Sequence, residues 1–438
     1  MNIPEVVQRI GYFFLNDKRY QYYDDLYKNL KFSRTEMIEH QNNLIKKIVK
    51  HAYYNTEYYK NIFNKLNLKP SDIMCKEDLK KLPELTKSNI RNNISQIKSN
   101  DFHGKKLIVD YSGGSTGNTA ILYKSPFFIQ MSRASTLRNN RLIGWKPSDK
   151  TVWLWGAPYE HQKIKHSFIS KLGILINRRQ LFNAYNYSKN DFPMWVEKIN
   201  QFKPKIIYGY ASIILEFSKF LLLNDIRFPF IRFIVSTTET LKGRETIEKA
   251  FHCRVYNQYG CREILSISIE TSKGVMSLSD DVVAVNHNDQ NEFLITALYS
   301  YGFPLINYKL GDCGTTPLEI DCENRLPFST LKLEIGRITD NFIRSTGNKV
   351  SSSALGVYIA SFQLPLIEYQ AIQLDYKKFH INYKPETNHE PEKIKKVFIE
   401  IFMEYFGNDI EILIKKVENI PVEKSGKKLM FKCLIRDD

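Results

Sequence analysis

The chain has 438 residues, of which 43% are hydrophobic and 25% are charged. These proportions are typical of a folded globular protein and exclude a largely disordered chain, and the length allows more than one domain. Lys and Arg outnumber Asp and Glu by 63 to 47, which gives a net charge of +16. An anionic small substrate such as a nucleotide accounts for this charge as well as nucleic acid does. The spread of the lysines over helical faces argues against nucleic acid.

Residues 1 to about 100 are predicted to be helical, because their apolar residues recur at helical spacing and ELTKSNIRNNISQI follows KKLP like a capped helix. From Lys106 on, strands alternate with helices, which predicts an α/β layer architecture. The predicted strands are KLIVDY, TVWLWGAP, PKIIYGY, IRFIVSTT and CRVYNQYG, and the helices between them include SKNDFPMWVEKINQF and GRETIEKAF.

A β-rich section is predicted next, since DVVAVN, NEFLITAL, FPLINYKLGD and LKLEIGRITDNFI follow one another without helices. Past Gly347 an α+β pattern begins, with IEYQAIQLDYKKFHINYK, the helix PEKIKKVFIEIFMEYFG and DIEILIKKV. We therefore expect an α/β fold with a large N-terminal domain, residues 1–339, and a small α+β domain, residues 340–438.

The cysteines and apolar segments indicate a cytoplasmic protein. Six cysteines are scattered without a C-x-x-C spacing, which favours a reducing compartment over a disulfide scaffold. The N-terminus lacks a basic start followed by an apolar region, so we expect no signal peptide. The most apolar helical stretch, ASIILEFSKFLLL, is interrupted by Glu216 and Lys219, so we expect no transmembrane segment. The oligomeric state is not indicated.

A run of glycines and hydroxyls follows the strand KLIVDY. Glycines allow a sharp turn and close approach to backbone N–H groups, and hydroxyls add uncharged donors, so the run is suited to an anion cradle or to a flexible surface turn. The loop is not the G-x-x-x-x-G-K-[ST] phosphate motif, because Asn118 stands where that motif has lysine. Its residues are Ser112, Gly113, Gly114, Ser115, Thr116 and Gly117.

Five later stretches contain further candidate residues, at strand ends or near the C-terminus. Taken singly, each is typical of a solvated carboxylate, a turn or a solvent-facing lysine. They are Glu239 in STTETL; Asn257, Gln258, Tyr259, Gly260 and Glu263 in YNQYGCRE; Asp312 in YKLGDCG; Gly336, Arg337 and Asp340 in GRITDNFI; and Pro421, Gly426 and Lys427 in IPVEKSGKKLMF.

In this order the stretches resemble the motifs of the adenylate-forming superfamily, the acyl-CoA synthetases and their relatives. The resemblance covers a phosphate loop at 112–117, Y-G-x-x-E at 259–263, G-D at 311–312, G-R-x-x-D at 336–340 and P-x-x-x-x-G-K at 421–427. The chain is most similar to the phenylacetate–CoA ligase-like branch, which includes capsular-polysaccharide CapK-type proteins. The stretches similar to that branch are LIKKIVKHAYYNTEYYKNIF, LPELTKSNIRNN, KPKIIYGYASIILEFSKFL and STTETLKGRETIEKAF.

The resemblance implies an ATP site in the large domain, and the residue chemistry agrees with it. The phosphate loop would hold the β- and γ-phosphates, Glu263 would bind Mg²⁺, and Tyr259 would lie beside adenine. Asp312 would accept both ribose hydroxyls, and Arg337 would approach the ribose or the α-phosphate. The remaining residues expected at the nucleotide are Glu239, Asn257, Gln258 and Gly260.

The resemblance also implies that the C-terminal domain is a mobile lid. It would turn about Asp340 and bring Lys427 to the carboxylate and α-phosphate during adenylation. Lys424 and Lys428 flank Lys427, so the assignment depends on spacing alone. Some relatives carry a structural zinc held by Cys and His, but here Met276 and an isolated Cys322 stand near the expected ligand positions. We therefore expect no structural zinc.

The expected function is ATP-dependent activation of a small carboxylic acid as acyl-AMP. The acyl group would then pass to coenzyme A or to an amine, for example on a sugar in surface-polysaccharide assembly. Two alternatives stay open at this point. One is a nucleotidyl transferase that adenylylates a hydroxyl group, and the other is a nucleotide-binding protein of the same fold without turnover.

Overall fold

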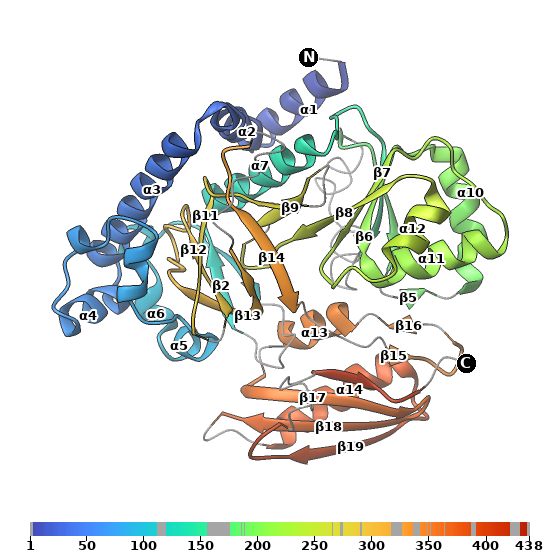
Figure 1. Ribbon diagram of the computed structural model, residues 1–438. Coiled ribbons are helices and arrows are strands. Elements are labelled where there is room, and N and C mark those ends of the chain that lie inside the picture. Colours follow the sequence, from blue (N-terminus) through green and yellow to red (C-terminus); the bar gives the residue numbers. More distant parts are fainter. Residues whose placement is uncertain are drawn as a thin grey trace. The chain divides into compact units, whose positions relative to one another are not determined.

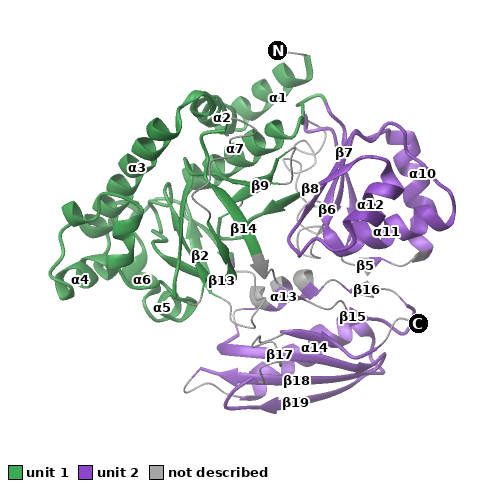
Figure 2. Ribbon diagram, in the orientation of Figure 1, with its two compact units in different colours: residues 1–110, 120–148, 256–336 green, residues 111–119, 149–255, 337–438 purple. Residues whose placement is uncertain are grey.

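A computed structural model of the chain describes fifteen segments, and its helices and strands are shown in Figure 1. The chain forms two compact units, one of residues 1–110, 120–148 and 256–336 and the other of residues 111–119, 149–255 and 337–438 (Figure 2). The described segments are 3–111, 120–155, 176–184, 186–187, 189–264, 266–271, 275–289, 291–316, 326–335, 342–347, 349–350, 352–362, 364–386, 391–420 and 430–435.

The first hundred residues are helical, as predicted. Ser33 begins α3 with a capping box to Glu36, and Thr86 begins α5 by accepting from the backbone N–H of Asn89. The helices of unit 1 are α1 (Ile3–Phe14), α2 (Arg19–Lys28), α3 (Arg34–Asn55), α4 (Glu57–Lys65), α5 (Lys87–Asn92), α6 (Ile94–Ile97) and α7 (Pro126–Leu142), with short 3-10 helices at Asn29–Lys31, Pro70–Asp72, Glu77–Lys81 and Asn100–Phe102.

Unit 1 also contains an antiparallel sheet in the order β11-β12-β13-β14-β10-β9-β8. Its apolar face packs with α7 and β2 into one core, so the predicted β-rich section is confirmed. The strands are β8 (Arg254–Tyr259, whose first two residues cluster with unit 2), β9 (Ser268–Glu270), β10 (Met276–Leu278), β11 (Val283–His287), β12 (Glu292–Ala297), β13 (Tyr308–Thr315) and β14 (Thr330–Ile335), beside the separate pair β1 (Ile108–Tyr111) and β2 (Ile121–Lys124).

Unit 2 contains a parallel sheet in the order β4-β3-β6-β7. Parallel strands need crossover connections, and the predicted helices before β6 and before β7 supply two of them. Val152, Leu154, Ile207 and Ile234 pack against these helices in one buried cluster. The elements are β3 (Thr151–Trp155), β4 (Arg179–Asn183), α10 (Phe192–Phe202), β6 (Ile206–Tyr210), α11 (Ala211–Leu223), β7 (Phe233–Thr237) and α12 (Arg244–Phe251), with the 3-10 helix Lys189–Asp191.

The C-terminal part has the predicted α+β pattern. Its sheet runs β19-β18-β17-β20, and the buried side of α14 packs with β17 and β18 in a separate core. The predicted boundary at 339/340 falls outside the described residues and stays a prediction. The elements are β15 (Phe342–Ile343) and β16 (Lys349–Val350), which join β5 (Asn186–Tyr187), then α13 (Ser352–Ser361), β17 (Leu366–Asp375), β18 (Lys378–Pro385), α14 (Pro391–Phe406), β19 (Glu411–Lys416) and β20 (Phe431–Cys433).

These elements confirm the α/β fold class. None of the helices in the described segments combines the length and the apolar character that crossing a membrane requires.

Candidate functional site

Two of the predicted nucleotide residues meet in unit 1. Tyr259 is the last residue of β8, and its hydroxyl donates a 3.0 Å hydrogen bond to Oδ2 of Asp312 in β13. Asp312 is only 5% exposed. The contact brings together the Y-G-x-x-E and G-D stretches, which are 53 residues apart in sequence.

The position of Asp312 differs from the sequence expectation. The sequence predicted that Asp312 lies at the end of a strand, but β13 continues to Thr315. Gly311 has a φ of +88°, a conformation that favours glycine, and the pairing of β13 with β14 shifts register between Cys313 and Gly314. An irregular strand, rather than a strand end, therefore carries the carboxylate.

Glu263, the predicted Mg²⁺ ligand, is held by a tyrosine that the sequence analysis did not identify. The hydroxyl of Tyr308 donates a 2.8 Å hydrogen bond to Oε1 of Glu263, and both residues are at most 1% exposed. Tyr308 begins β13, where Leu85 is bonded to the backbone on both sides of it, at Asn307 and Lys309. Burial and this backbone attachment therefore fix the orientation of the carboxylate.

The segment between Tyr259 and Glu263 is a compact turn containing Gly260. The N–H of Cys261 donates to the carbonyl of Ile264 at 2.9 Å, and the N–H of Ile267 donates to the carbonyl of Tyr259 at 3.0 Å. These bonds return the chain toward β9, so the turn presents Tyr259 and Glu263 from one short segment.

Asn257 and Gln258 are engaged in the packing of β8. The backbone N–H of Asn257 donates to Oε2 of Glu270 at 2.8 Å. The side chain of Gln258 is buried and donates to Oγ of Ser266 at 3.2 Å. Both residues therefore attach β8 to the segment that follows the turn, a role that the sequence did not reveal.

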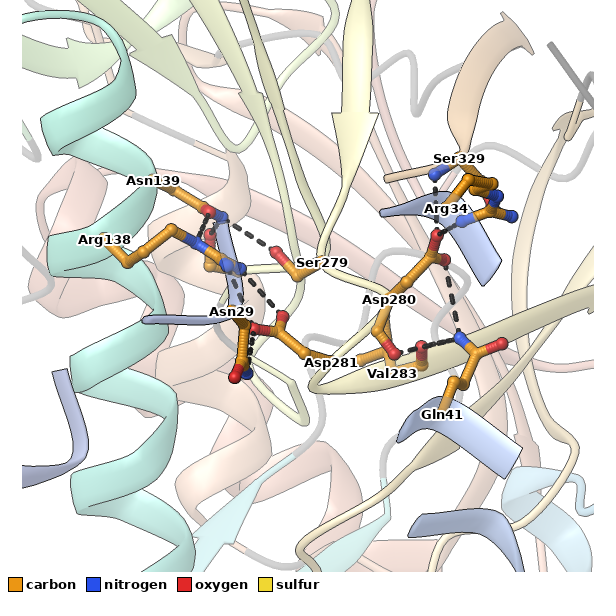
Figure 3. A network of polar contacts seen from close by, with 11 residues as sticks. Asn29, Arg34, Gln41, Arg138, Asn139, Ser279, Asp280, Asp281, Val283 and Ser329 are labelled. Atoms are coloured by element: carbon orange, nitrogen blue, oxygen red, sulfur yellow. Dashed lines mark hydrogen bonds and ion pairs between the residues drawn. The ribbon is translucent and has the colours of Figure 1, made fainter. Parts of the chain in front are cut away.

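Ser266 also bonds Asn139, which belongs to the larger buried polar network shown in Figure 3. Asn139 of α7 donates to Ser266 at 2.7 Å and to Ser279 at 2.9 Å. The adjacent Arg138 makes two 3.0 Å hydrogen bonds to Asp281, and neither side chain of that ion pair is exposed. The network attaches α7 both to the connection between β10 and β11 and to the segment after Glu263.

The second half of the network is centred on Asp280. Its carboxylate accepts from Arg34 at 2.7 Å and from the backbone N–H of Ser329 at 2.6 Å, while Gln41 donates to the backbone carbonyls of Asp280 and Val283, both at 2.9 Å (Figure 3). The start of α3 is thereby fixed to the same connection between β10 and β11.

A further ion cluster lies where β1 approaches the turn. Asp110, two residues before Ser112, accepts from Nζ of Lys124 at 2.6 Å and lies 3.3 Å from Nη2 of Arg262. Lys124 also donates to the backbone carbonyl of Arg262. The residue next to Glu263 is therefore joined to the strand that leads into the predicted phosphate loop.

Glu239 lies in unit 2, two residues after β7, and is described with that unit alone. Its Oε2 accepts a 2.8 Å hydrogen bond from the backbone N–H of Ser212 in the first turn of α11. A carboxylate at this position stabilises the N-terminus of a helix. Oε1 is buried and receives no hydrogen bond from the described residues, and burial raises the pKa of the Glu239 carboxyl above its ordinary value.

The described residues contain no group of three or more His, Cys, Asp or Glu side chains that could hold a metal ion. A single buried carboxylate such as Glu263 suits Mg²⁺, which prefers oxygen ligands and commonly shares its coordination with phosphates and water. The expected absence of structural zinc stays a prediction. Several predicted residues lie outside the described segments: Ser112 to Gly117, Arg337, Asp340 and Lys427.

Comparison with known proteins relates the chain to CapK. Residues 342–436 match the family described as the CapK C-terminal domain. Protein CapK of Staphylococcus aureus is 27% identical over 433 residues, which cover 95% of this chain and 94% of that protein.

Solved structures of 2-hydroxyisobutyryl-CoA ligase have a similar fold. The structure with 2-HIB-AMP and CoA in the thioesterification state has a TM-score of 0.58 at 13% identity, covering 93% of this chain and 91% of that one. The postadenylation state with 2-HIB-AMP has a TM-score of 0.56 at 13% identity, covering 92% and 91%. The resemblance predicted from the motifs is confirmed: the chain is similar to CapK over most of its length, and its fold is similar to that of an acyl-CoA ligase.

Proposed function

We propose that this protein is an ATP-dependent ligase that converts a small carboxylic acid into its acyl adenylate and transfers the acyl group to an acceptor. The observation that carries the proposal is the contact of Tyr259 with Asp312. Glu263 follows Tyr259 by four residues, and Tyr308 holds its carboxylate in place. The contact joins two motifs that are far apart in sequence, which supports their binding of a single nucleotide.

The proposed chemistry assigns each of these groups a task. In adenylation the substrate carboxylate attacks the α-phosphate and pyrophosphate leaves, so the protein mainly positions reactants and balances charge. The carboxylate of Asp312 accepts hydrogen bonds from the ribose hydroxyls, and the ring of Tyr259 lies against the base. Glu263 holds Mg²⁺, which neutralises phosphate charge when bound.

The residues outside the described segments complete the proposal. The loop from Ser112 to Gly117 holds the leaving phosphates through backbone N–H groups and hydroxyls. Arg337 contacts the ribose or the α-phosphate, and Lys427 bridges the α-phosphate and the substrate carboxylate. Their roles are supported by their places in the motifs.

For the acceptor we propose coenzyme A or an amine. The similar fold of a ligase crystallised with an acyl-AMP and CoA supports a thiol acceptor. The likeness to CapK supports an acceptor in surface-polysaccharide assembly, where an amino sugar would provide the amine. Adding CoA should raise the turnover of the acid if CoA is the acceptor, and should not raise it if the acceptor is an amine.

The experiment that tests the proposal measures pyrophosphate release from ATP and Mg²⁺ with a panel of small carboxylic acids, with and without CoA. We expect release that depends on one class of acid, with free AMP appearing once the acceptor is present. Glu263→Gln, which keeps the size and the hydrogen-bond acceptor, is the control and should lose this release.

Two results would contradict the proposal. AMP found covalently attached to a hydroxyl compound would indicate a nucleotidyl transferase. Nucleotide binding without pyrophosphate release from any acid would indicate a binding protein that has lost turnover.

A further inference from the structure

The first helix of the chain, α1, turns its apolar residues outward. Its five exposed residues are all large and hydrophobic, and their exposed fractions lie between 50% and 81%. Single exposed apolar residues are common on protein surfaces, but a group of them on one helix indicates a surface that another molecule covers. The five residues are Ile3, Val7, Ile10, Phe13 and Phe14.

Polar residues on the opposite side of α1 hold it in this orientation. Gln8 is 1% exposed, donates a 2.7 Å hydrogen bond to the carbonyl of Pro147 and accepts from the hydroxyl of Tyr20. Arg9 donates to both carboxylate oxygens of Asp24 in the neighbouring α2, at 2.7 Å and 2.9 Å (Figure 1). Turning the apolar face inward would break these bonds, so the packing of unit 1 keeps that face on the outside.

The spacing of the apolar residues indicates that the partner is a helix. Ile3, Val7, Ile10 and Phe14 follow one another at intervals of four, three and four residues. This is the spacing of positions a and d in helices that pair side by side, and such a stripe packs along a matching stripe on a second helix. A second copy of α1 provides a matching stripe, and a two-fold axis brings the same surface of both copies together.

The area of the exposed face is sufficient for two copies to associate. At their exposed fractions the five side chains present about 500 Å² of apolar surface. Two copies that cover these side chains bury about 1,000 Å² in total, which is close to the smallest area of specific protein–protein interfaces. A face of this size supports a weak dimer with a dissociation constant in the micromolar range.

The charges around α1 favour a protein partner over an anionic membrane surface. The whole chain carries a net charge of +16, but α1, α2 and the residues between them contain as many acidic as basic residues. A locally neutral surface does not attract anionic lipids, and it does not repel a second copy as the net charge of the whole chain would. The acidic residues are Glu5, Asp17, Asp24 and Asp25, and the basic residues are Arg9, Lys18, Arg19 and Lys28.

We infer that the exposed apolar face of α1 is a dimer interface, which binds the same face of a second copy of this chain. The face contains none of the residues assigned to ATP, so the inference does not depend on the proposed function. In a two-fold pair every substitution on this face occurs twice, and single replacements should therefore have large effects on association.

Sedimentation velocity of the full chain, at concentrations up to about 100 μM, tests the inference. We expect wild-type protein to reach twice the monomer mass. Phe14→Glu should raise the dissociation constant by about 100-fold or more, because it places two charges in an apolar interface. Leu223→Glu is the matched control, since Leu223 is 86% exposed on α11, and this variant should dimerise like the wild type. Melting temperatures monitor folding.

A charge-exchange experiment locates the contact. Ile10 stands in the middle of the apolar stripe, so a two-fold axis through the face brings the Ile10 side chains of the two copies close together. Ile10→Glu and Ile10→Lys should each be monomeric, because each variant opposes like charges. An equimolar mixture of the two variants should recover dimers, because it opposes unlike charges.

Three results would overturn the inference: wild-type protein that stays monomeric at the highest concentration, a Phe14→Glu dimer as stable as that of the wild type, and a mixture of the two Ile10 variants that stays monomeric. Monomeric wild-type protein that floats with vesicles of equal parts phosphatidylglycerol and phosphatidylcholine, when Phe14→Glu does not, would assign the face to a lipid surface instead.

Discussion

Asp312, which we propose to bind the ribose of ATP, is held in place by its surroundings. Its carboxylate is buried and accepts from Tyr259, and the left-handed φ of Gly311 directs the backbone immediately before it. A hydrogen bond to a ribose hydroxyl is made equally in the ground state and the transition state, so it contributes to ATP binding more than to the rate of the chemical step.

Asp312→Ala should therefore raise KM for ATP by about 10–100-fold with a much smaller change in kcat, since hydrogen bonds to charged groups contribute about 1.5–3 kcal/mol. Tyr259→Phe, which removes only the hydroxyl that donates to Asp312, is the matched control and should raise KM less. Steady-state kinetics with varied ATP measure both effects. A collapse of kcat with an unchanged KM would show that the ribose assignment is wrong.

Glu239 gives a pH-dependent prediction. Burial raises the pKa of this carboxyl, and the N–H of Ser212 opposes the shift only in part. A raised pKa means that the folded protein binds the proton more tightly than the unfolded chain. The stability that Glu239 contributes is therefore present below the ordinary carboxyl pKa and is lost as pH rises through the raised value.

Wild-type protein should consequently lose stability relative to Glu239→Gln as pH rises from about 4 to 7. Glutamine keeps an oxygen that can accept from Ser212 but does not titrate. Melting temperatures of both proteins across this range provide the comparison. A difference that stays constant with pH, or that changes in favour of the wild type, would refute the assignment.

The residues that the sequence identified stand in local motifs, whereas those it missed act through contacts with residues distant in sequence. Asp312, Glu263 and Tyr259 stand in short motifs of fixed spacing, so their positions could be read directly. Tyr308 and Lys124 act through contacts with residues distant in sequence, and no local pattern marks them. Tyr308 lies four residues before Asp312, which was the one available signal.

At the scale of elements, α7 shows why periodicity fails at a buried polar helix. Its buried side includes Ser132, Ser135, Arg138 and Asn139 beside apolar residues, so the apolar repeat that predicts a helix is interrupted. The buried sides of α3 and α11 are mostly apolar, with Gln41 and Ser218 as exceptions, and both helices were predicted. What α7 buries is the polar network that fixes the segment following Glu263.

Removing one partner of the buried ion pair should have a large effect on stability. Arg138→Met leaves Asp281 as an unbalanced buried charge and should lower the free energy of unfolding by about 3–5 kcal/mol. The double variant Arg138→Met with Asp281→Asn should recover much of the loss, because the amide is neutral and still accepts from Asn29. Urea denaturation of the two variants measures this difference, and equal destabilisation would contradict the charge argument.

At the scale of the whole molecule, the two compact units were not predictable from the sequence. The alternation of strands and helices predicted the α/β part, and the run of strands predicted the β-rich part. Unit 1, however, combines the N-terminal helices with strands more than 140 residues later in the chain, which local patterns do not encode. Domain motion about Asp340 stays a proposal from the motif.

Replacing Lys427 tests the proposed domain motion. If it meets the α-phosphate only during adenylation, Lys427→Ala should slow acid-dependent pyrophosphate release by about 10²–10³-fold, the usual cost of one preorganised contact. Transfer from a supplied acyl adenylate should stay near the wild-type rate. Lys424→Ala and Lys428→Ala are the matched controls, and both half-reactions should be normal in them. Equal losses in the two half-reactions of Lys427→Ala would refute a two-orientation mechanism.

The formation of an acyl adenylate is tested most directly with an acid labelled with ¹⁸O in its carboxylate. When the carboxylate attacks the α-phosphate, one of its oxygens bridges the acyl group and phosphorus. Acyl transfer then breaks the bond between that oxygen and the carbonyl carbon. Mass spectrometry of the released AMP should find one ¹⁸O atom per AMP. AMP without the label, or AMP that remains attached to a hydroxyl compound, would contradict an acyl-adenylate intermediate.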